Sequence, residues 1–291
     1  MLFSGRPASI VMGAAFKRCH YVAAVNMFRV YRKPFEMFRR YLLGQGTYPA
    51  VVEVKSPIGE LSLNVYSAHD VVTVNEVFCR RDYRAERTDR IFVDFGSNIG
   101  ISAAYFLSRN SDGFAYLFEP LARNIERLKR NLTRFEGRYE LHEVAVGEQE
   151  GQVEFGWEET GRYGGVGKRT GQYVSVPCVD SNDALEQILS KHGRIDVLKI
   201  DIEALERQIT ERIPAKLAAN ILKLFVEFPF EANPLQYTHS HRRYSSVAQF
   251  FRLAETPARE TIDLTCDDKD HPTARSPAHA SVDPKSRGLQ K

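Results

Sequence analysis

Apolar residues after residue 90 fall into short continuous runs that alternate with longer segments of helical apolar period. Short apolar runs predict buried strands, whereas segments whose apolar positions recur with a period of about 3.6 predict helices. Such alternation is typical of a mainly parallel sheet that is covered by helices on both faces. We therefore expect an α/β fold with a doubly wound, mainly parallel sheet.

The expected elements after residue 90 form one series of strands and helices with a hairpin inserted in it. The expected strands are residues 91–95, 114–119, 139–146, 195–201 and 221–228. The expected helices are residues 98–109, 121–134 and 203–212. Between the third and fourth strands, the runs 152–157 and 173–178 predict a hairpin. After residue 230 the pattern weakens, and it predicts one more helix at 245–253 and a short strand at 260–264.

Residues before 90 predict an N-terminal helical and β-hairpin extension. The runs Ala50–Lys55 and Leu61–Tyr66 alternate apolar and polar residues, and the segment Ser56–Gly59 between them is typical of a turn. Residues 17–43 interleave apolar and basic residues, which predicts two short amphipathic helices that are separated before Pro34.

The chain is thus expected to divide into four consecutive regions. They are a basic amphipathic helical extension at 1–47, a β-hairpin and linker at 48–90, the main domain at 91–265 and a tail at 266–291. The tail is polar and nearly free of large apolar residues, so we expect it to be disordered.

Composition limits the class of protein further. The 291 residues suit one α/β domain with appendages, and a net charge of +3 gives no marked basic excess, so no nucleic-acid partner is expected. The four cysteines are widely spaced and predict neither a zinc site nor a disulfide framework. No apolar run approaches the roughly 20 residues of a membrane span, and no signal peptide is evident. The expected compartment is the cytoplasm.

The basic segment at residues 17–43 leaves two interpretations open. It carries seven basic residues against the single acid Glu36. These helices could cover the sheet with their arginines in solvent, or they could contact an anionic membrane or a partner protein. Peripheral membrane contact through this segment is therefore one hypothesis for its role.

A nucleoside-binding βαβ unit is predicted from residue 91 onward. The apolar run that contains Asp94 is followed by two glycines, Gly96 and Gly100, which allow a left-handed turn and close approach of a ligand to the backbone at a helix start. The next apolar run ends in Glu119, where an acid can accept hydrogen bonds from both hydroxyls of a ribose.

The ligand of this unit is expected to be cationic. A dinucleotide site requires Gly-x-Gly-x-x-Gly, and this chain has Ser97, Asn98 and Ile99 after Gly96 instead. An acid at Asp94 disfavours a phosphate and favours a positive charge. S-adenosyl-L-methionine has a ribose, an ammonium and a sulfonium group but no phosphate, so it fits this pattern better.

Over roughly residues 48–229 the sequence resembles the class I S-adenosylmethionine-dependent methyltransferases, and within them the FkbM family. The segments that carry the resemblance are Val93–Gly100, Phe118–Pro120 with the following Asn124 and Asn131, Val144–Gly147, Leu198–Glu206 and the upstream stretch Asp70–Tyr83. The resemblance implies a Rossmann-like fold and O-methylation of a hydroxyl on a sugar, glycan or natural product. An antiparallel strand pair usually ends the sheet of these enzymes, and this chain indicates that pair only faintly.

The cofactor site is expected to combine residues from these segments. The candidate residues are Asp94, Gly96, Ser97, Asn98, Gly100, Glu119, Pro120, Ala145, Val146 and Asp201. Asp94 would meet the ligand ammonium and Glu119 the ribose, whereas the resemblance alone puts Ala145 and Val146 near the adenine. We place Asp201 near the methionine moiety or the acceptor hydroxyl. Asp201 and Glu203 lack an evident third ligand, so no metal is expected.

Methyl transfer to a hydroxyl requires alignment of the acceptor and a group that takes its proton. Asp201 and Glu227 are the candidates for that group, and His239 and His241 are alternatives with more suitable intrinsic pKa values. The glycine-rich segment 159–173 is expected to form a lid over the acceptor.

Two other functions stay open. Ala204 replaces the glycine of the family's Asp-x-Glu-Gly, and at a position of positive φ it would strain the turn by roughly 1 kcal/mol. This change and the faint final strands are compatible with a degenerate methyltransferase fold that only binds. A nicotinamide-dependent oxidoreductase would share the sheet and Glu119 but needs the glycine triple that this chain lacks.

Overall fold

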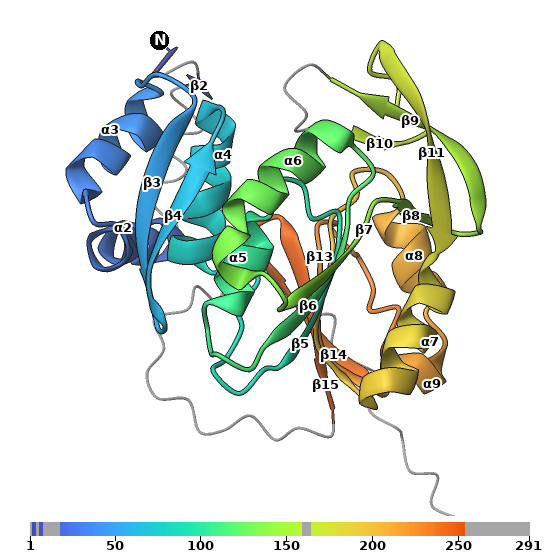
Figure 1. Ribbon diagram of the computed structural model, residues 1–291. Coiled ribbons are helices and arrows are strands. Elements are labelled where there is room, and N and C mark those ends of the chain that lie inside the picture. The colour runs from blue at the N-terminus through green and yellow to red at the C-terminus, as the bar shows by residue number, and fades with distance from the viewer. Residues whose placement is uncertain (1, 4–5, 8–17, 159–163, 254–291) are drawn as a thin grey trace, which may run out of the picture.

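The centre of the molecule is a twisted, mainly parallel sheet (Figure 1). Within residues 2–3, 6–7, 18–158 and 164–253, which the computed structural model describes, this sheet has seven strands in the order β14-β15-β13-β12-β5-β6-β7. They are β5 (Ile91–Phe95), β6 (Phe114–Phe118), β7 (Tyr139–His142), β12 (Ile195–Ile200), β13 (Ile221–Val226), β14 (His239–Tyr244) and β15 (Val247–Arg252). The neighbours from β7 to β13 pair in parallel, and β15 and β14 pair antiparallel. The expected α/β fold is confirmed.

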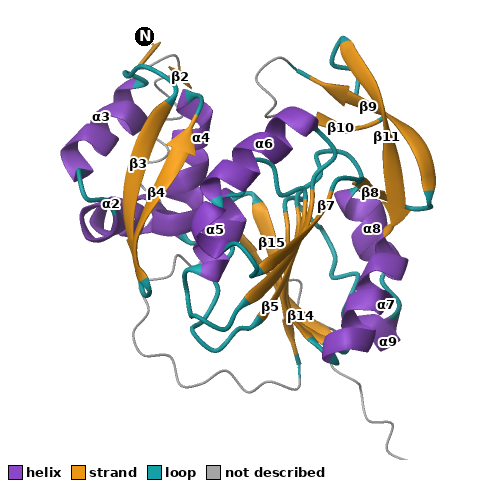
Figure 2. Ribbon diagram, viewed as in Figure 1, coloured by secondary structure: helices purple, strands orange, loops and turns teal. Residues whose placement is uncertain are grey.

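Helices cover both faces of the sheet (Figure 2). One face carries α5 (Ile101–Leu107) and α6 (Ala122–Asn131), and the other carries α7 (Ser181–His192), α8 (Glu206–Arg212) and α9 (Ala215–Ala218). Successive side chains of β5 point to opposite faces, so Phe92 joins the apolar cluster that contains α5 and Val93 joins the cluster that contains α7. Burial on both faces explains why these strands are continuous apolar runs.

The chain changes direction across the sheet next to β5. It runs from β5 to β6 and β7 on one side, and later returns to place β12 on the other side, where Ile200 pairs with Phe95. After β5 and after β12 the chain therefore continues to helices on opposite faces of the sheet, α5 and α8. In open α/β sheets such a point forms the ligand crevice.

A smaller sheet in the order β10-β9-β11-β8 adjoins the central one. Its strands are β8 (Ala145–Gly147), β9 (Gly151–Trp157), β10 (Gly164–Val166) and β11 (Gln172–Asp180). The expected hairpin is confirmed as β9 and β11, but the single strand expected at 139–146 is wrong. It divides into β7 and β8, because β8 pairs in parallel with β11 and leaves the central sheet. The lid was expected at residues 159–173. Its segment β10 belongs to the small sheet, and residues 159–163 lie outside the described residues.

The helix expected at 245–253 is wrong, because this segment contains β15. Lys223 of β13 pairs with Phe251, and β14 pairs along the other edge of β15. Val247, Ala248 and Phe250 are fully buried, as in a strand covered on both faces. The final antiparallel pair, only faintly indicated in the sequence, thus completes the sheet. The short strand expected at 260–264 and the tail at 266–291 lie outside the described residues.

The N-terminal extension contains the expected helices and hairpin. Its elements are β1 (Leu2–Phe3), β2 (Arg6–Pro7), α2 (Arg18–Val30), α3 (Pro34–Leu43), β3 (Ala50–Ser56), β4 (Gly59–Val65), α4 (Ala68–Val74) and the π-helix η1 (Asn75–Arg80). The segment expected to be a linker therefore includes two helical elements. Ser67 and Asp70 form a capping box that starts α4.

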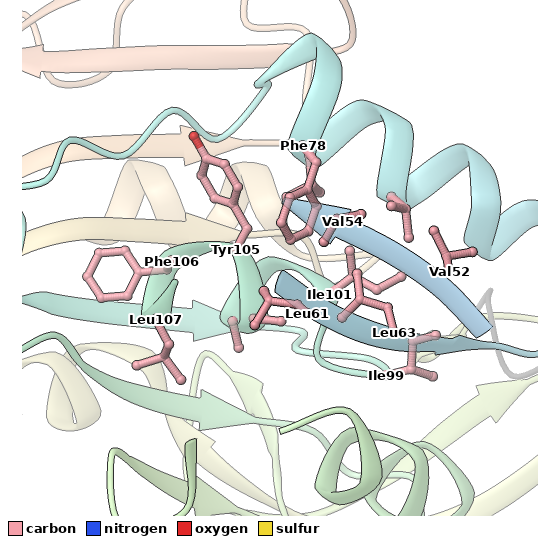
Figure 3. Packing of buried hydrophobic residues seen from close by; sticks show 14 of the residues in the cluster. Val52, Val54, Leu61, Leu63, Phe78, Ile99, Ile101, Tyr105, Phe106 and Leu107 are labelled. Carbon is pink, nitrogen blue, oxygen red and sulfur yellow. The ribbon is translucent and has the colours of Figure 1, made fainter. Parts of the chain in front are cut away.

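The extension shares its apolar core with α5 (Figure 3). Val54 and Leu63 of the hairpin pack in one cluster with Phe78 of η1 and with Ile101 and Tyr105 of α5. The rings of Phe78 and Tyr105 meet edge to face at 5.2 Å. This packing holds η1 beside the start of α5, near the crevice.

None of the described helices has both the length and the apolar character that a membrane crossing needs. Cys79 and Cys178 are buried free thiols.

Candidate functional site

A cavity of about 310 Å³ opens at the carboxyl ends of β5, β6 and β12. Its size falls within the range of small-molecule sites, roughly 300–1,000 Å³. The loops after these strands form one wall, the small sheet forms a second, and α4 and η1 form a third. Of the ten candidate cofactor residues, eight line it: Gly96, Ser97, Asn98, Glu119, Pro120, Ala145, Val146 and Asp201.

Gly96 is required where β5 meets the loop after β12. Its φ is +87°, and a Cβ at this position would lie 1.9 Å from the backbone oxygen of Asp201. Gly100, by contrast, does not line the cavity. With a φ of +81° it caps the start of α5, and a Cβ there would lie 3.1 Å from Leu128 of α6. This geometry gives Gly100 a role in helix packing, and its contact with the cofactor stays a prediction.

Hydrogen bonds tie the glycine turn to β6 and to the hairpin. Ser97 Oγ donates to the backbone oxygen of Asp94 at 3.0 Å and accepts from the Phe118 N–H at 3.1 Å. Asn131, a residue of the family motif, donates to the backbone oxygen of Ile99 at 2.9 Å and accepts from Asn64 N–H at 2.7 Å. The turn is thus held from two sides before any ligand binds.

Glu119 presents a buried carboxyl group to the cavity. Its Oε2 accepts from the Asn98 N–H at 2.9 Å, and its Oε1 accepts from the Leu121 N–H at 3.1 Å and from Asn124 Nδ2 at 3.2 Å. Burial raises the pKa of Glu119 to about 7. Three of about four acceptor positions of the carboxylate are occupied, so Oε2 keeps one for a ligand hydroxyl.

Apolar side chains of the small sheet also line the cavity. Ala145 and Val146 of β8 are buried in this apolar surface, and Phe155 and Val166 of the small sheet continue it. This surface can accept a flat apolar group, but it offers no side-chain hydrogen bonds of its own.

Asp94 lies beneath the cavity floor and does not line it. It is completely buried, and its carboxylate accepts from Lys199 Nζ at 2.9 Å and from the Ser102 hydroxyl. Burial raises the pKa of Asp94, while Lys199 and Ser102 oppose that rise. Lys199 thus occupies the carboxylate side that a ligand ammonium would meet, and contact of Asp94 with that ammonium, directly or through water, stays a prediction.

Lys199 connects the two strands on either side of the crevice. Besides Asp94, its Nζ contacts the backbone oxygen of Gly96 at 3.0 Å and Asp201 Oδ2 at 3.3 Å. Burial alone would lower its pKa, but the carboxylates of Asp201 and Asp94 raise it, so the ammonium stays charged. Two carboxylates against one ammonium leave one negative charge at the floor, which favours a cationic ligand.

The two proton-acceptor candidates lie together. Asp201 and Glu227 share a hydrogen bond, and the charge of Asp201 followed by desolvation raises the pKa of Glu227 well above its usual range. Burial opposes ionisation of Asp201, but Lys199 and hydrogen bonds from Glu227 and Tyr83 lower its pKa. The opposite directions of these two pKa shifts favour one proton shared by the pair near neutral pH.

Tyr83 was not predicted as a site residue. Its hydroxyl donates to Asp201 Oδ2 at 3.3 Å, and its ring lies 5.4 Å from Lys199 Nζ. Ser102 and the small-sheet residue Phe155 were missed as well. Tyr83 lies within the upstream family segment Asp70–Tyr83, which was the one sequence signal that could have found it.

His239 and His241 are wrong as alternatives. His239 hydrogen-bonds the backbone oxygen of Ile221 at 2.9 Å, at the amino end of β13 and so at the opposite end of the sheet from the cavity. His241 stacks on Phe250 at 4.8 Å and does not line the cavity. Both side chains support the packing of the last strands.

Ala204, in the loop after β12, does not strain the backbone, because its φ is not positive. The left-handed residue of this loop is Glu203, with a φ of 65°. Glu203 also accepts from Lys168 Nζ at 2.6 Å, which joins this loop to the small sheet. Glu206 accepts from the Ile202 N–H at 3.0 Å and is structural. Among the described residues, no group of three or more His, Cys, Asp and Glu side chains could hold a metal ion.

Comparisons with known proteins identify the family of the chain. The sequence model of the family described as "Methyltransferase FkbM domain" matches residues 94–242. A curated relative is the AMB antimetabolite synthetase AmbE of Pseudomonas aeruginosa, which is 25% identical over 170 residues. That match covers 57% of this chain and 8% of AmbE, so the chain spans a small part of its relative's length.

Among solved structures, a methyltransferase from Geobacter sulfurreducens has a TM-score of 0.35 at 13% identity and covers 58% of this chain and 73% of its own. An O-methyltransferase family protein from Burkholderia thailandensis has a TM-score of 0.36 at 10% identity, and the match covers 64% of this chain and 58% of that protein. TrmK of M. capricolum, in complex with S-adenosyl-homocysteine, has a TM-score of 0.34 at 10% identity, and the match covers 66% of this chain and 73% of TrmK.

Proposed function

The chain belongs to the FkbM methyltransferase domain family, and on this basis we propose that it transfers a methyl group from S-adenosyl-L-methionine to a hydroxyl of a small-molecule or carbohydrate acceptor. The observation that carries the proposal is the glycine turn whose Asn98 N–H donates to the buried carboxylate of Glu119. Such a turn suits a neutral diol and a nearby cation. It does not suit a phosphate.

The cofactor would be held by residues of all three walls. The free acceptor position of Glu119 suits one ribose hydroxyl, and the apolar surface at Ala145 and Val146 suits the adenine. The net negative floor at Asp201 suits the ammonium and the sulfonium. When bound, the cofactor supplies an activated methyl group, and its sulfur leaves uncharged.

Glu227 is our candidate for the group that takes the proton of the acceptor hydroxyl. It is exposed at the cavity wall, where an acceptor can reach it, whereas Asp201 is partly buried and already accepts from Lys199 and Tyr83. A raised pKa makes the ionised form of Glu227 the stronger base of the two. Asp201 then acts as a positioning residue that holds Glu227 and raises its pKa.

The acceptor is proposed to enter between Glu227 and the small sheet. Phe155 and Val166 give that side an apolar surface, and Lys168 with Glu203 gives it polar groups. Mixed apolar and polar surfaces suit a sugar ring or a hydroxylated natural product. The resemblance to the family supports the same class of acceptor.

The deciding experiment is calorimetric titration with S-adenosyl-L-methionine, S-adenosyl-homocysteine and NAD. We expect both adenosyl ligands to bind and NAD not to bind. Glu119→Ala should weaken binding of the adenosyl ligands about tenfold to a hundredfold, because it removes a hydrogen bond to a charged acceptor. Glu126→Ala on the exposed face of α6 is the matched control and should bind as the parent does.

Other outcomes separate the alternatives. Binding of NAD in place of the adenosyl ligands would indicate an oxidoreductase. Pools of host metabolites and glycans are incubated with the protein and the cofactor, and mass spectrometry detects methylated products. Binding of the adenosyl ligands with no methylated product would indicate a protein that binds the cofactor but does not transfer the methyl group.

A further inference from the structure

An apolar surface lies on the outer side of α2 and α3. In the described part of the chain, eleven large apolar side chains are exposed, and six of them belong to these two helices. They are Tyr21, Val25, Phe28, Phe35, Leu42 and Leu43, which we call the α2–α3 face. Phe35 is 78% exposed and Tyr21 is 62% exposed. Scattered exposed apolar residues are ordinary, but a contiguous group marks an interaction site.

The α2–α3 face is continuous from one helix to the other. The ring centroids of Phe28 and Phe35 lie 5.7 Å apart, and those of Phe28 and Phe38 lie 5.2 Å apart. The opposite sides of the same helices pack into the protein, since Met27 and Met37 are buried in the core shared with α5. The face is therefore additional to what folding requires.

Exposed basic side chains accompany the α2–α3 face. Arg29 is on α2, Arg39 is on α3, and Lys33 lies between the two helices. The one acid of the two helices, Glu36, pairs with Arg40 at 3.0 Å. The face thus combines apolar side chains with positive charge.

We propose that the α2–α3 face binds the surface of a membrane that contains anionic lipids. Apolar side chains would enter the boundary between headgroups and acyl chains while the basic groups contact the lipid phosphates, as amphipathic interfacial helices do. A second copy of the chain is a poorer occupant, because a two-fold contact would bring the same positive groups together.

The position of the face agrees with this role. Figure 1 places α2 and α3 at the end of the molecule away from the small sheet and from α7, α8 and α9. These helices also pack on η1 and α4, which carry the cavity residues Glu76 and Thr73. Lipid binding would therefore hold the cavity near a membrane surface while leaving the small sheet free. This inference does not depend on the proposed reaction.

The test is cosedimentation of the full chain with vesicles of phosphatidylcholine alone and with vesicles that also contain phosphatidylserine. We expect binding to the anionic vesicles only, with loss of binding at high salt. The variant Arg29→Gln, Lys33→Gln, Arg39→Gln should bind about a hundredfold more weakly. The variant Phe35→Ser, Leu42→Ser should bind at least about tenfold more weakly, because it removes apolar surface.

The matched control carries Lys191→Gln, Arg207→Gln and Lys216→Gln on α7, α8 and α9, which removes the same charge from the other side of the molecule. It should bind as the parent does. All substituted side chains are exposed, and circular dichroism checks that each variant is folded. The proposal is overturned if the control variant loses as much vesicle binding as the α2–α3 charge variant does, or if the chain binds only neutral vesicles. It is also overturned if the chain is a dimer that Phe35→Ser, Leu42→Ser dissociates.

Discussion

At the scale of single residues, the end of β5 is fixed by how closely Gly96 approaches the backbone of Asp201. Gly96→Ala would force these backbones apart and also place alanine at a φ of +87°. We expect the free energy of unfolding to fall by about 3 kcal/mol or more, measured by urea denaturation.

Gly137→Ala is the matched control for Gly96→Ala. Its φ is +78°, but no atom lies within 4 Å of the added Cβ, so only the backbone strain of about 1 kcal/mol remains. Equal losses in the two variants would mean that close approach at Gly96 is unimportant.

The Asp201–Glu227 pair predicts how the rate depends on pH. If ionised Glu227 takes the acceptor proton, kcat rises with pH until Glu227 has lost its own proton, above neutrality. Glu227→Gln should lower kcat about a hundredfold. Asp201→Asn removes the main cause of the raised pKa, so the rising limb should move to lower pH.

The measurement is kcat over pH with saturating cofactor, once an acceptor is identified. Full activity of Glu227→Gln, or a rising limb that stays in place in Asp201→Asn, would exclude Glu227 as the base.

At the scale of elements, the antiparallel edge formed by β14 and β15 decides whether the sheet is complete. A single phenylalanine tests it, since Phe250 of β15 is fully buried beside Phe230 and His241. Phe250→Ala should lower the free energy of unfolding by about 3 to 5 kcal/mol, measured by urea denaturation. Tyr237→Ala, 85% exposed just before β14, should change it by less than about 0.5 kcal/mol. A small effect at Phe250 would mean that this edge is peripheral.

At the scale of the whole molecule, the extension and the sheet share one core, so we expect them to unfold together. Leu63 of β4 is fully buried in that core, and Leu63→Ala should lower the free energy of unfolding by about 2 to 5 kcal/mol. Trp157, the one tryptophan of the sequence, lies in β9 of the small sheet. Its fluorescence transition should shift together with the far-ultraviolet circular dichroism. A fluorescence transition that Leu63→Ala leaves unchanged would show that the small sheet unfolds separately from the core that contains Leu63.

The structural predictions that the fold confirms each depend on a short segment of consecutive residues. The glycine turn, the acid after β6 and the strands β5, β6, β12 and β13 each depend on residues that are neighbours in sequence. The strand at 139–146 and the helix at 245–253 failed because a short apolar run does not specify its partner. β8 leaves the central sheet only because β11 is available to pair with it.

By itself, the sequence determined the α/β series and the turn that closes β5, since local backbone preference and apolar period decide these features. Tertiary structure decided that Lys199 pairs with Asp94, that Tyr83 reaches Asp201, and that Asp201 and Glu227 share one proton. These pairings join residues that are far apart in the chain. Their energies depend on distance and burial, which only the folded arrangement of the strands sets.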